Sequence, residues 1–206
     1  MNSAKIISIA TLLTIAALAP LSRAQEEESR WRSADLAVTY SSERAQVATV
    51  GCPCFWLQGG SVNGSTTLFR GIGVAVNVTG EHKSDFTLNQ DLNKISFLAG
   101  PRYTFNTSRW TQIYTEGHHP SYVFAEALFG VAHGFDGVFP TSTGTQSTAN
   151  AFSTQIGGGL NIALWRGFGL RAFEADYIRT EFPNGTSGTQ NDFRFAIGVS
   201  YHLHQR

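Results

Sequence analysis

Charge, cysteine and long apolar runs are all scarce in this 206-residue sequence. Charged residues make up 15% of it, and 15 Lys and Arg balance 15 Asp and Glu, so the chain has no basic excess of the kind that binds nucleic acid. No stretch after residue 24 is uniformly apolar, which excludes a helical membrane protein. In contrast, 42% of the residues are hydrophobic and 12% are aromatic, which excludes a disordered chain. The length fits one domain, or two small ones.

Residues 1–24 have the pattern of a secretory signal peptide. Lys5 gives a positive start, a mostly apolar segment follows, and Ser22 and Ala24 are small residues of the kind that a signal peptidase reads. A membrane anchor is the alternative, but the apolar run is short for a spanning helix and leads into three glutamates rather than a stop-transfer cluster. We therefore predict that the leader is removed and that residues 25–206 form the exported domain.

The exported part alternates apolar residues with polar or small ones, and this period of two predicts β-strands. In the last segment, the odd positions from Phe193 to Leu203 are apolar or aromatic, whereas the even positions from Asp192 to His202 are polar or small. Seven other segments repeat the pattern, most weakly the second, where glycines and Trp56 blur the two faces. Eight strands are predicted, at 36–40, 54–67, 72–78, 95–105, 123–132, 152–164, 170–182 and 193–203.

The links between these strands predict the topology. Alternate links are long and polar, at 41–53, 81–92, 133–150 and 183–190, and tight turns are expected at 64–67 and 166–168. Long loops on one side and short turns on the other are typical of a transmembrane barrel, and an even number of strands returns both termini to the periplasmic side. The link 106–120 is too long for a tight turn, and its apolar residues suggest strands that continue beyond the membrane.

The face opposite the apolar one distinguishes a membrane barrel from a soluble β-sandwich, which would also alternate. This second face carries many small residues, such as Gly100, Gly130 and Gly157, with only isolated charges. The solvent face of a sandwich would favour Thr, Lys, Glu and Arg instead. Small residues beside single charges fit the narrow interior of an eight-stranded barrel. A secreted sandwich or a lipocalin-like barrel is the alternative.

Aromatic residues gather near the ends of the predicted strands, as they do in the girdles at the headgroup level of a membrane. One predicted rim contains Tyr40, Phe55, Tyr177 and Phe193, and the other contains Tyr103, Phe105, Trp165, Phe168 and Tyr201. The sequence therefore predicts an all-β fold, an eight-stranded antiparallel up-and-down transmembrane β-barrel, with apolar side chains towards lipid and polar ones inside.

Several short runs resemble a bacterial outer-membrane β-barrel family. They are FLAGPR at 97–102, ALFGVAH at 127–133, GGGL at 157–160, ADY at 175–177 and GVSY at 198–201. Across residues 34–204 the plan is similar to the porin-like, eight-stranded transmembrane domain related to outer membrane protein A. The resemblance implies a place in the cell outer membrane, contact with its lipid, and insertion by the barrel-assembly machinery. That machinery reads a terminal aromatic residue; Tyr201 and Leu203 keep the spacing here, although three polar residues follow.

Isolated charges on the inward face predict two ionic clusters inside the barrel. Arg102 and Glu126 lie on adjacent predicted strands, and Arg194 lies beside Glu174 and Asp176 of the preceding strand. Charges removed from water must be paired, or their pKa values shift. We expect them to pair and to fill the lumen, and a gated ion path through them is the alternative. Further polar lining is expected from Asp35, Asn77, Gln155 and Asn161.

Cys52 and Cys54 flank Pro53 in the first predicted outer loop, and an even number of cysteines in an oxidising compartment suggests a disulfide. A ring this small is strained, so a bond between chains and free thiols both remain open. A metal site that adds His82 and His133 would rest on a two-residue spacing alone. We therefore predict no metal and no cofactor.

Catalysis is considered because some outer-membrane barrels modify lipid A with Ser, His and an acid in hydrogen-bond reach. The segment from His118 to Ser121 offers a histidine and a serine on one strand face, but Pro120 disrupts a strand and no acid on the matching face is evident nearby. We predict that the protein is not an enzyme.

Two functions remain for such a barrel. The first is a structural or surface-binding role, in which outer loops such as 140–150 contact a surface ligand. The second is a narrow porin for small solutes or ions. The predicted partners are outer-membrane lipid and the assembly machinery, without nucleic acid.

Overall fold

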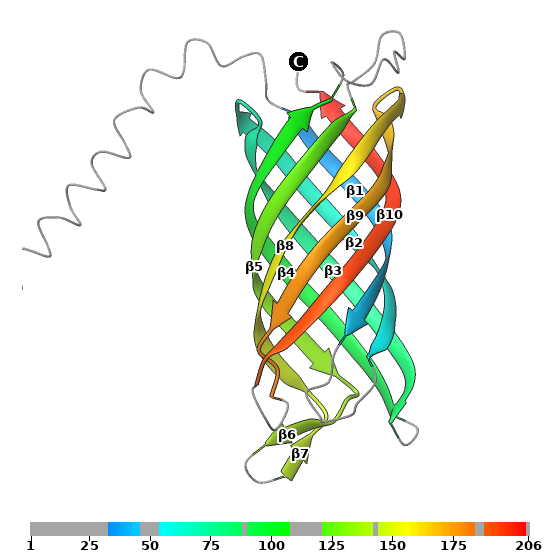
Figure 1. Cartoon of the computed structure of the whole chain (residues 1–206), viewed down its shortest axis with the longest axis vertical. Coiled ribbons are helices and arrows are strands. Elements are labelled where there is room, and N and C mark those ends of the chain that lie inside the picture. Colours follow the sequence, from blue (N-terminus) through cyan, green and yellow to red (C-terminus); the bar gives the residue numbers. More distant parts are fainter. Residues whose placement is uncertain are drawn as a thin grey trace, which may run out of the picture.

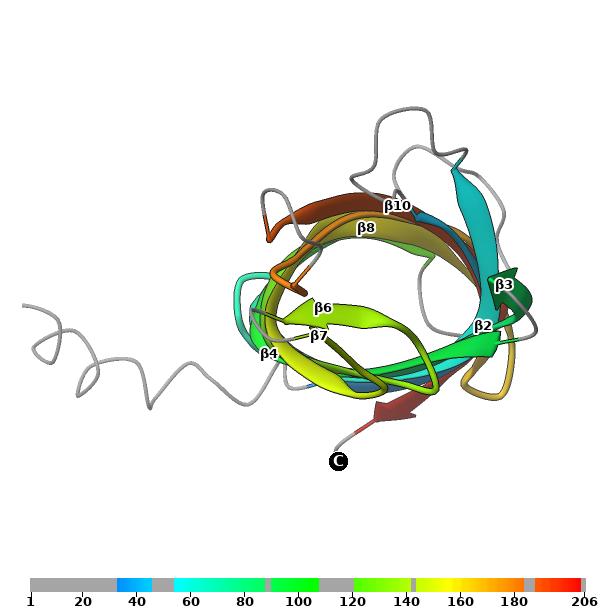
Figure 2. The same ribbon diagram turned by 90° about the horizontal axis from the view of Figure 1, so that it is seen from below.

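The chain folds into a closed barrel of eight antiparallel strands (Figures 1 and 2). A computed structural model describes residues 33–45, 54–87, 90–107, 121–141, 144–183 and 188–204. The barrel strands are β1 (Ser33–Ala45), β2 (Phe55–Phe69), β3 (Ile72–Thr87), β4 (Gln90–Asn106), β5 (Tyr122–Phe135), β8 (Ala149–Trp165), β9 (Phe168–Thr180) and β10 (Gln190–His204). They follow one another round the ring in the order β1-β10-β9-β8-β5-β4-β3-β2, and β1 pairs with β10 to close it. The predicted up-and-down architecture is confirmed.

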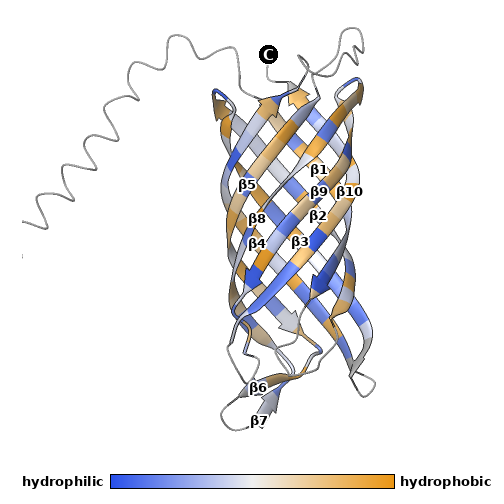
Figure 3. Ribbon diagram, viewed as in Figure 1, coloured by the Kyte–Doolittle hydropathy of each residue, from blue (hydrophilic) through white to orange (hydrophobic). Residues whose placement is uncertain are grey.

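The barrel wall has its apolar side on the outside. On β1, Leu36 and Val38 are about half exposed, whereas Ala37 between them is buried. Ile156, Ile197 and Val199 are between 58% and 60% exposed, far more than the core of a soluble sandwich would allow. Apolar and polar residues alternate along the strands in Figure 3. An apolar exterior of this extent is the lipid-facing surface of a transmembrane barrel, which excludes the sandwich alternative. No helix among the described residues is long and apolar enough to cross a membrane.

The two ends of the barrel differ in their connections. At the upper end in Figure 1 lie the tight turns from β2 to β3 and from β8 to β9, together with the start of β1 and the end of β10. The lower end carries three links of nine residues or more, one of which holds a short hairpin of β6 (Phe139–Thr141) and β7 (Gly144–Gln146), whereas the upper end has one long link, 107–121. In transmembrane barrels the short turns are periplasmic and the longer loops extracellular, so we call the upper end periplasmic and the lower end extracellular.

Both aromatic rims are present, with one exception. Tyr40, Tyr177 and Phe193 are exposed on the outer surface towards the extracellular end, and the five aromatics of the other rim are exposed towards the periplasmic end, namely Tyr103, Phe105, Trp165, Phe168 and Tyr201. Phe55 is not part of the outer rim. It lies two residues before the buried Leu57, so it is on the same, inward side of the strand.

The prediction of a tight turn at 64–67 is wrong. The second strand continues through these residues to Phe69, and the chain reverses at Arg70 and Gly71, which have φ values of 47° and 86°. A two-residue hairpin turn of type I′ has two such positive angles, and Gly71 supplies one of them without strain. Gly64 is an ordinary strand residue, since a β-carbon there would meet nothing within 4 Å.

Several links that were expected to be loops are largely strand. The third strand runs to Thr87 and the fourth begins at Gln90, so most of the link 81–92 is a β-ladder that extends past the membrane. The alternation fades there because neither face of such an extension has to meet lipid. The link 133–150 holds the ends of β5 and β8 and the hairpin, while most of 106–120 lies outside the described residues.

The β6–β7 hairpin lies across part of the extracellular mouth (Figure 2). It is held by Phe139, which is 8% exposed and whose ring centroid lies 5.4 Å from that of Phe182. These two rings form an apolar cluster with three alanines at the ends of β5 and β8, and Leu92 packs against it. This cluster is a small apolar cap at one end of the barrel. A second buried apolar cluster consists of Ala75, Leu98 and Leu128, and most of the other buried side chains are polar or charged.

Candidate functional site

Charged side chains converge inside the barrel and form what we call the lumen network. Its members lie on six strands, point inward and are almost fully buried: Asp35, Glu43, Glu81, Lys94, Arg102, Glu126, Arg171, Glu174, Asp176, Asp192 and Arg194. The alternation of the strands places all of them there except Arg171, because each of the others is flanked along its strand by outward-facing neighbours. All five residues of the two ionic clusters expected from the sequence are among them.

Arg194, which is 1% exposed, crosses the lumen. Its Nε and Nη2 donate hydrogen bonds to Oδ2 of Asp176 at 3.0 and 2.8 Å, and Nη2 also lies 3.3 Å from Oε1 of Glu174. Its Nη1 donates to Oγ1 of Thr79 at 2.7 Å. Thr79 is on β3, which is not a neighbour of β10 in the ring. One guanidinium therefore ties together strands from opposite sides of the barrel.

Arg102 and Glu126 lie opposite each other on β4 and β5, with Nη1 of the arginine 3.6 Å from Oε2 of the glutamate. The same Nη1 donates a hydrogen bond to Oδ1 of Asn63 at 2.8 Å. The guanidinium carbon lies 3.8 Å from the ring centroid of Phe124, and that of Arg171 lies 4.6 Å from it. The buried aromatic ring thus contacts two cations, which partly replace their lost hydration by cation–π attraction.

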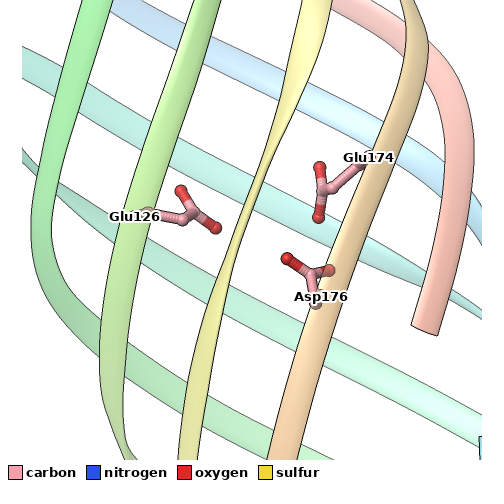
Figure 4. A group of neighbouring side chains, drawn as sticks. All are labelled: Glu126, Glu174 and Asp176. Carbon is pink, nitrogen blue, oxygen red and sulfur yellow. The ribbon is translucent and has the colours of Figure 1, made fainter. Parts of the chain in front are cut away.

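The two expected clusters are brought together by a triad of carboxyl groups. Glu126 extends from β5, and Glu174 and Asp176 extend from β9 towards the same part of the lumen (Figure 4). One oxygen from each lies within 4.8 Å of the others. Gly157, on the strand between them, makes this possible: a β-carbon there would lie 2.0 Å from Oδ1 of Asp176. Three arginines, 102, 171 and 194, lie against the same three acids, so the group is neutral without a metal ion, although the carboxyl oxygens could ligate one.

A second charged group lies nearer the extracellular end. Nζ of Lys94 is 2.9 Å from Oε2 of Glu81, and it also donates to Oε1 of Glu43. The three side chains come from β4, β3 and β1. Because β1 is a neighbour of neither β3 nor β4, this group also spans the lumen. Sequence reasoning missed it because residues 41–53 and 81–92 were expected to be loops, and because the predicted strand at 95–105 began one residue after Lys94. Continuing the inward parity from Thr39, Thr79 and Ser96 would have found all three.

Arg171 was missed for a different reason. Counting in steps of two from Glu174 places it on the lipid side, yet it is 0% exposed and its Nη1 lies 2.6 Å from Oε2 of Glu174. The register of β9 shifts against both neighbouring strands between residues 171 and 174, which marks a β-bulge. The extra residue of a bulge lets two positions three apart point to the same side.

Cys52 lies outside the described residues, so the disulfide stays a prediction. Cys54 precedes β2, and its Sγ lies 3.5 Å from Nη2 of Arg44. Each of the two histidines considered as further ligands bonds to an asparagine of a neighbouring strand: Nδ1 of His82 lies 2.8 Å from Oδ1 of Asn93, and that of His133 lies 2.7 Å from Oδ1 of Asn150.

The segment considered for catalysis lies mostly outside the described residues. Of its members only Ser121 is described, and its hydroxyl accepts a hydrogen bond from the backbone N–H of Ala163 at 3.1 Å. This contact fixes the hydroxyl to the wall of the barrel at its periplasmic end.

These observations define the class of protein: a closed eight-stranded barrel of the outer-membrane type, with an apolar exterior and a charged, filled interior. No protein-family model and no curated protein matches the chain. Solved structures share its fold, among them the following two. Ail, the attachment invasion locus protein of Yersinia pestis, solved with the heparin analogue sucrose octasulfate, matches with a TM-score of 0.53 and 14% identity over 84% of this chain and 99% of its own. Neisserial surface protein A (NspA) matches with a TM-score of 0.54 and 11% identity over 82% and 96%. The expected resemblance is confirmed at the level of fold.

Proposed function

We propose that this protein spans a bacterial outer membrane as a closed plug and binds a ligand with its extracellular end. The observation that carries the proposal is the bonding of Arg194 to β3 and β9, which crosses the interior of the barrel. A solute on its way through would have to break a buried ion pair and leave charges unpaired, which costs about 3–5 kcal/mol. The barrel then serves as a rigid support for the surface that it presents.

The same structure supports the proposed location. The exposed apolar wall needs lipid, and the predicted leader at 1–24 would deliver the chain to the periplasm, where the barrel-assembly machinery inserts such proteins. The leader lies outside the described residues, so its removal is part of the proposal. Mass spectrometry of the protein extracted from outer membranes tests it directly, and a chain that still begins at Met1 would contradict it.

The binding surface is proposed to be the extracellular hairpin with the neighbouring strand ends. Phe139 anchors the hairpin to the apolar cap, whereas all three residues of β7 are exposed. An anchored element with an outward polar edge can present side chains in a fixed geometry, which limits the entropy lost on binding. Because Ail was solved with sucrose octasulfate, a sulfated sugar is the first ligand to try.

Binding is tested with cells that display the protein on immobilised sucrose octasulfate and on a panel of host-surface glycans. Exchange of Thr145 and Gln146 of β7 for alanine is expected to weaken capture at least tenfold, with surface expression unchanged. Exchange of Thr104, at the periplasmic end, serves as the matched control and is expected to have no effect. Equal capture of the unchanged protein and of both variants would contradict a role of the hairpin in binding.

A narrow pore is the second function that the barrel fold allows, and planar bilayers separate it from the plug. The plug predicts no single-channel steps from protein whose closed barrel is shown by a heat-dependent shift in gel mobility. Regular steps that change when Arg194 is exchanged would replace the plug by an ion path through the lumen network.

A further inference from the structure

The two tight periplasmic turns have the same construction, although they are far apart in the sequence. One reads Phe69-Arg70-Gly71 and the other Trp165-Arg166-Gly167. Both arginines have a φ of 47°, and the glycines that follow have φ values of 86° and 85°. The two turns therefore share their residue types and their backbone angles.

Arginine is an unusual choice at the first position of such a turn. A two-residue hairpin turn with two positive φ angles favours Asn, Asp or Gly at this position, because side chains with a full β-carbon are strained there. Both of the tight turns that the structure describes nevertheless have arginine in this strained conformation. A strained backbone that recurs with the same side chain indicates that the side chain is needed for something other than folding.

The surroundings of the two arginines are also alike. The guanidinium carbon of Arg70 lies 4.9 Å from the ring centroid of Phe69, and that of Arg166 lies 4.4 Å from the ring centroid of Trp165. Both aromatic rings are about half exposed on the outer wall. Stacking on the preceding ring holds each guanidinium at the edge of the lipid-facing surface and leaves its N–H donors free to point outward.

A tyrosine of the neighbouring strand lies against the glycine of each turn. The backbone carbonyl of Gly71 accepts a hydrogen bond from the N–H of Thr104 at 2.8 Å, and that of Gly167 accepts one from His202 at 2.7 Å. The residue before each donor is a tyrosine whose ring lies close to the turn glycine, 3.5 Å and 3.3 Å from where a β-carbon would be. These rings belong to Tyr103 and Tyr201, which are 38% and 37% exposed at the aromatic rim.

We propose that each turn is a binding site for the phosphate of an anionic phospholipid in the periplasmic leaflet. The guanidinium offers two parallel N–H donors to phosphate oxygens, the tyrosine hydroxyl lies at the same rim, and the exposed aromatic rings meet the upper acyl chain. Neither turn contains an acidic residue, so the net charge of each site is positive. The inference rests on the proposed function, because it requires the barrel to lie in a membrane.

The barrel separates the two sites. Between the β2–β3 turn and the β8–β9 turn lie β4 and β5 on one side of the ring and β1 and β10 on the other. The two turns therefore lie on opposite sides of the barrel, as Figure 1 also shows. One headgroup cannot reach both, so the protein binds two lipids independently, and the loss of one arginine removes one of them.

The test is native mass spectrometry of the protein extracted from membranes of cells that express the full chain. The protein is exchanged into micelles that contain phosphatidylglycerol or, separately, phosphatidylcholine. We expect two retained phosphatidylglycerol molecules on the unchanged protein, one on Arg70→Asn, one on Arg166→Asn and none on the double variant. Asparagine suits the turn backbone, so these variants should fold at least as well. Arg179→Asn, an exposed arginine near the other end of β9, is the matched control and should retain both lipids.

Equal retention of the two lipids, or retention that does not change in the two turn variants, would overturn the inference. A loss of lipid in Arg179→Asn as large as in the turn variants would do the same, because it would show a general effect of charge. The proposed function is judged separately: a protein that fails to insert into liposomes at all would contradict the membrane barrel, whereas a folded barrel without phosphatidylglycerol would contradict the lipid sites alone.

Discussion

Exchange of Arg194 for methionine is the most direct test of the lumen network. The substitution keeps an unbranched side chain and removes the cation that donates two hydrogen bonds to Asp176. Glu174 keeps Arg171, whose Nη1 lies 2.6 Å away, so one buried carboxylate rather than two loses its partner. Removing one member of a buried ion pair costs about 3–5 kcal/mol. In a domain of this size, each kcal/mol lost lowers the unfolding midpoint by about 2–4 °C, so the expected fall is about 6–20 °C.

The assay is the midpoint temperature of the heat-dependent gel shift, supported by urea unfolding in liposomes. Arg179→Met is the control, because this arginine is exposed on the same side of the ring and is expected to contribute less than about 1 kcal/mol. A second variant, Arg194→Met with Asp176→Asn, removes the unpaired charge and should recover part of the loss. The reasoning is refuted if Arg194→Met unfolds within experimental error of Arg179→Met, or if the double variant is no more stable than the single one.

Three further predictions concern the close approach at the carboxyl triad, the cap and the turns. Gly157→Ala should destabilise the barrel by about 1–3 kcal/mol in urea, because its β-carbon would meet a carboxylate oxygen at 2.0 Å; Gly64→Ala, with nothing within 4 Å, is the control and should be neutral. Phe139→Ala should speed proteolysis within the hairpin while the gel shift of the barrel persists, and unchanged cleavage would contradict the anchoring role. Arg70→Asn and Arg166→Asn should each raise the urea midpoint by the equivalent of about 1 kcal/mol, and a lower midpoint would argue against strain at the turns.

Sequence periodicity was sufficient to predict the wall of the barrel. Wherever a strand crosses lipid, one face must be apolar and the other must fit a narrow lumen, so the pattern has to hold at each step of two. This is why Phe193 to Leu203 could be assigned residue by residue, and why parity alone places Arg102, Glu126, Glu174, Asp176 and Arg194 inside the barrel. Beyond the membrane the same constraint is absent, and there the predicted strands ended too early.

The amino-acid sequence by itself thus determined the architecture, the direction in which each membrane-spanning strand faces, and the parity of its charges. Only the tertiary structure decided which charges meet. Arg194 reaches Thr79, 115 residues away, because closure of the ring brings β3 and β10 to opposite walls of one narrow lumen. Arg171 joins them because a bulge breaks the period of two. Such contacts depend on the register and closure of all eight strands. The local sequence pattern indicates only which side chains of a strand face lipid and which face the lumen.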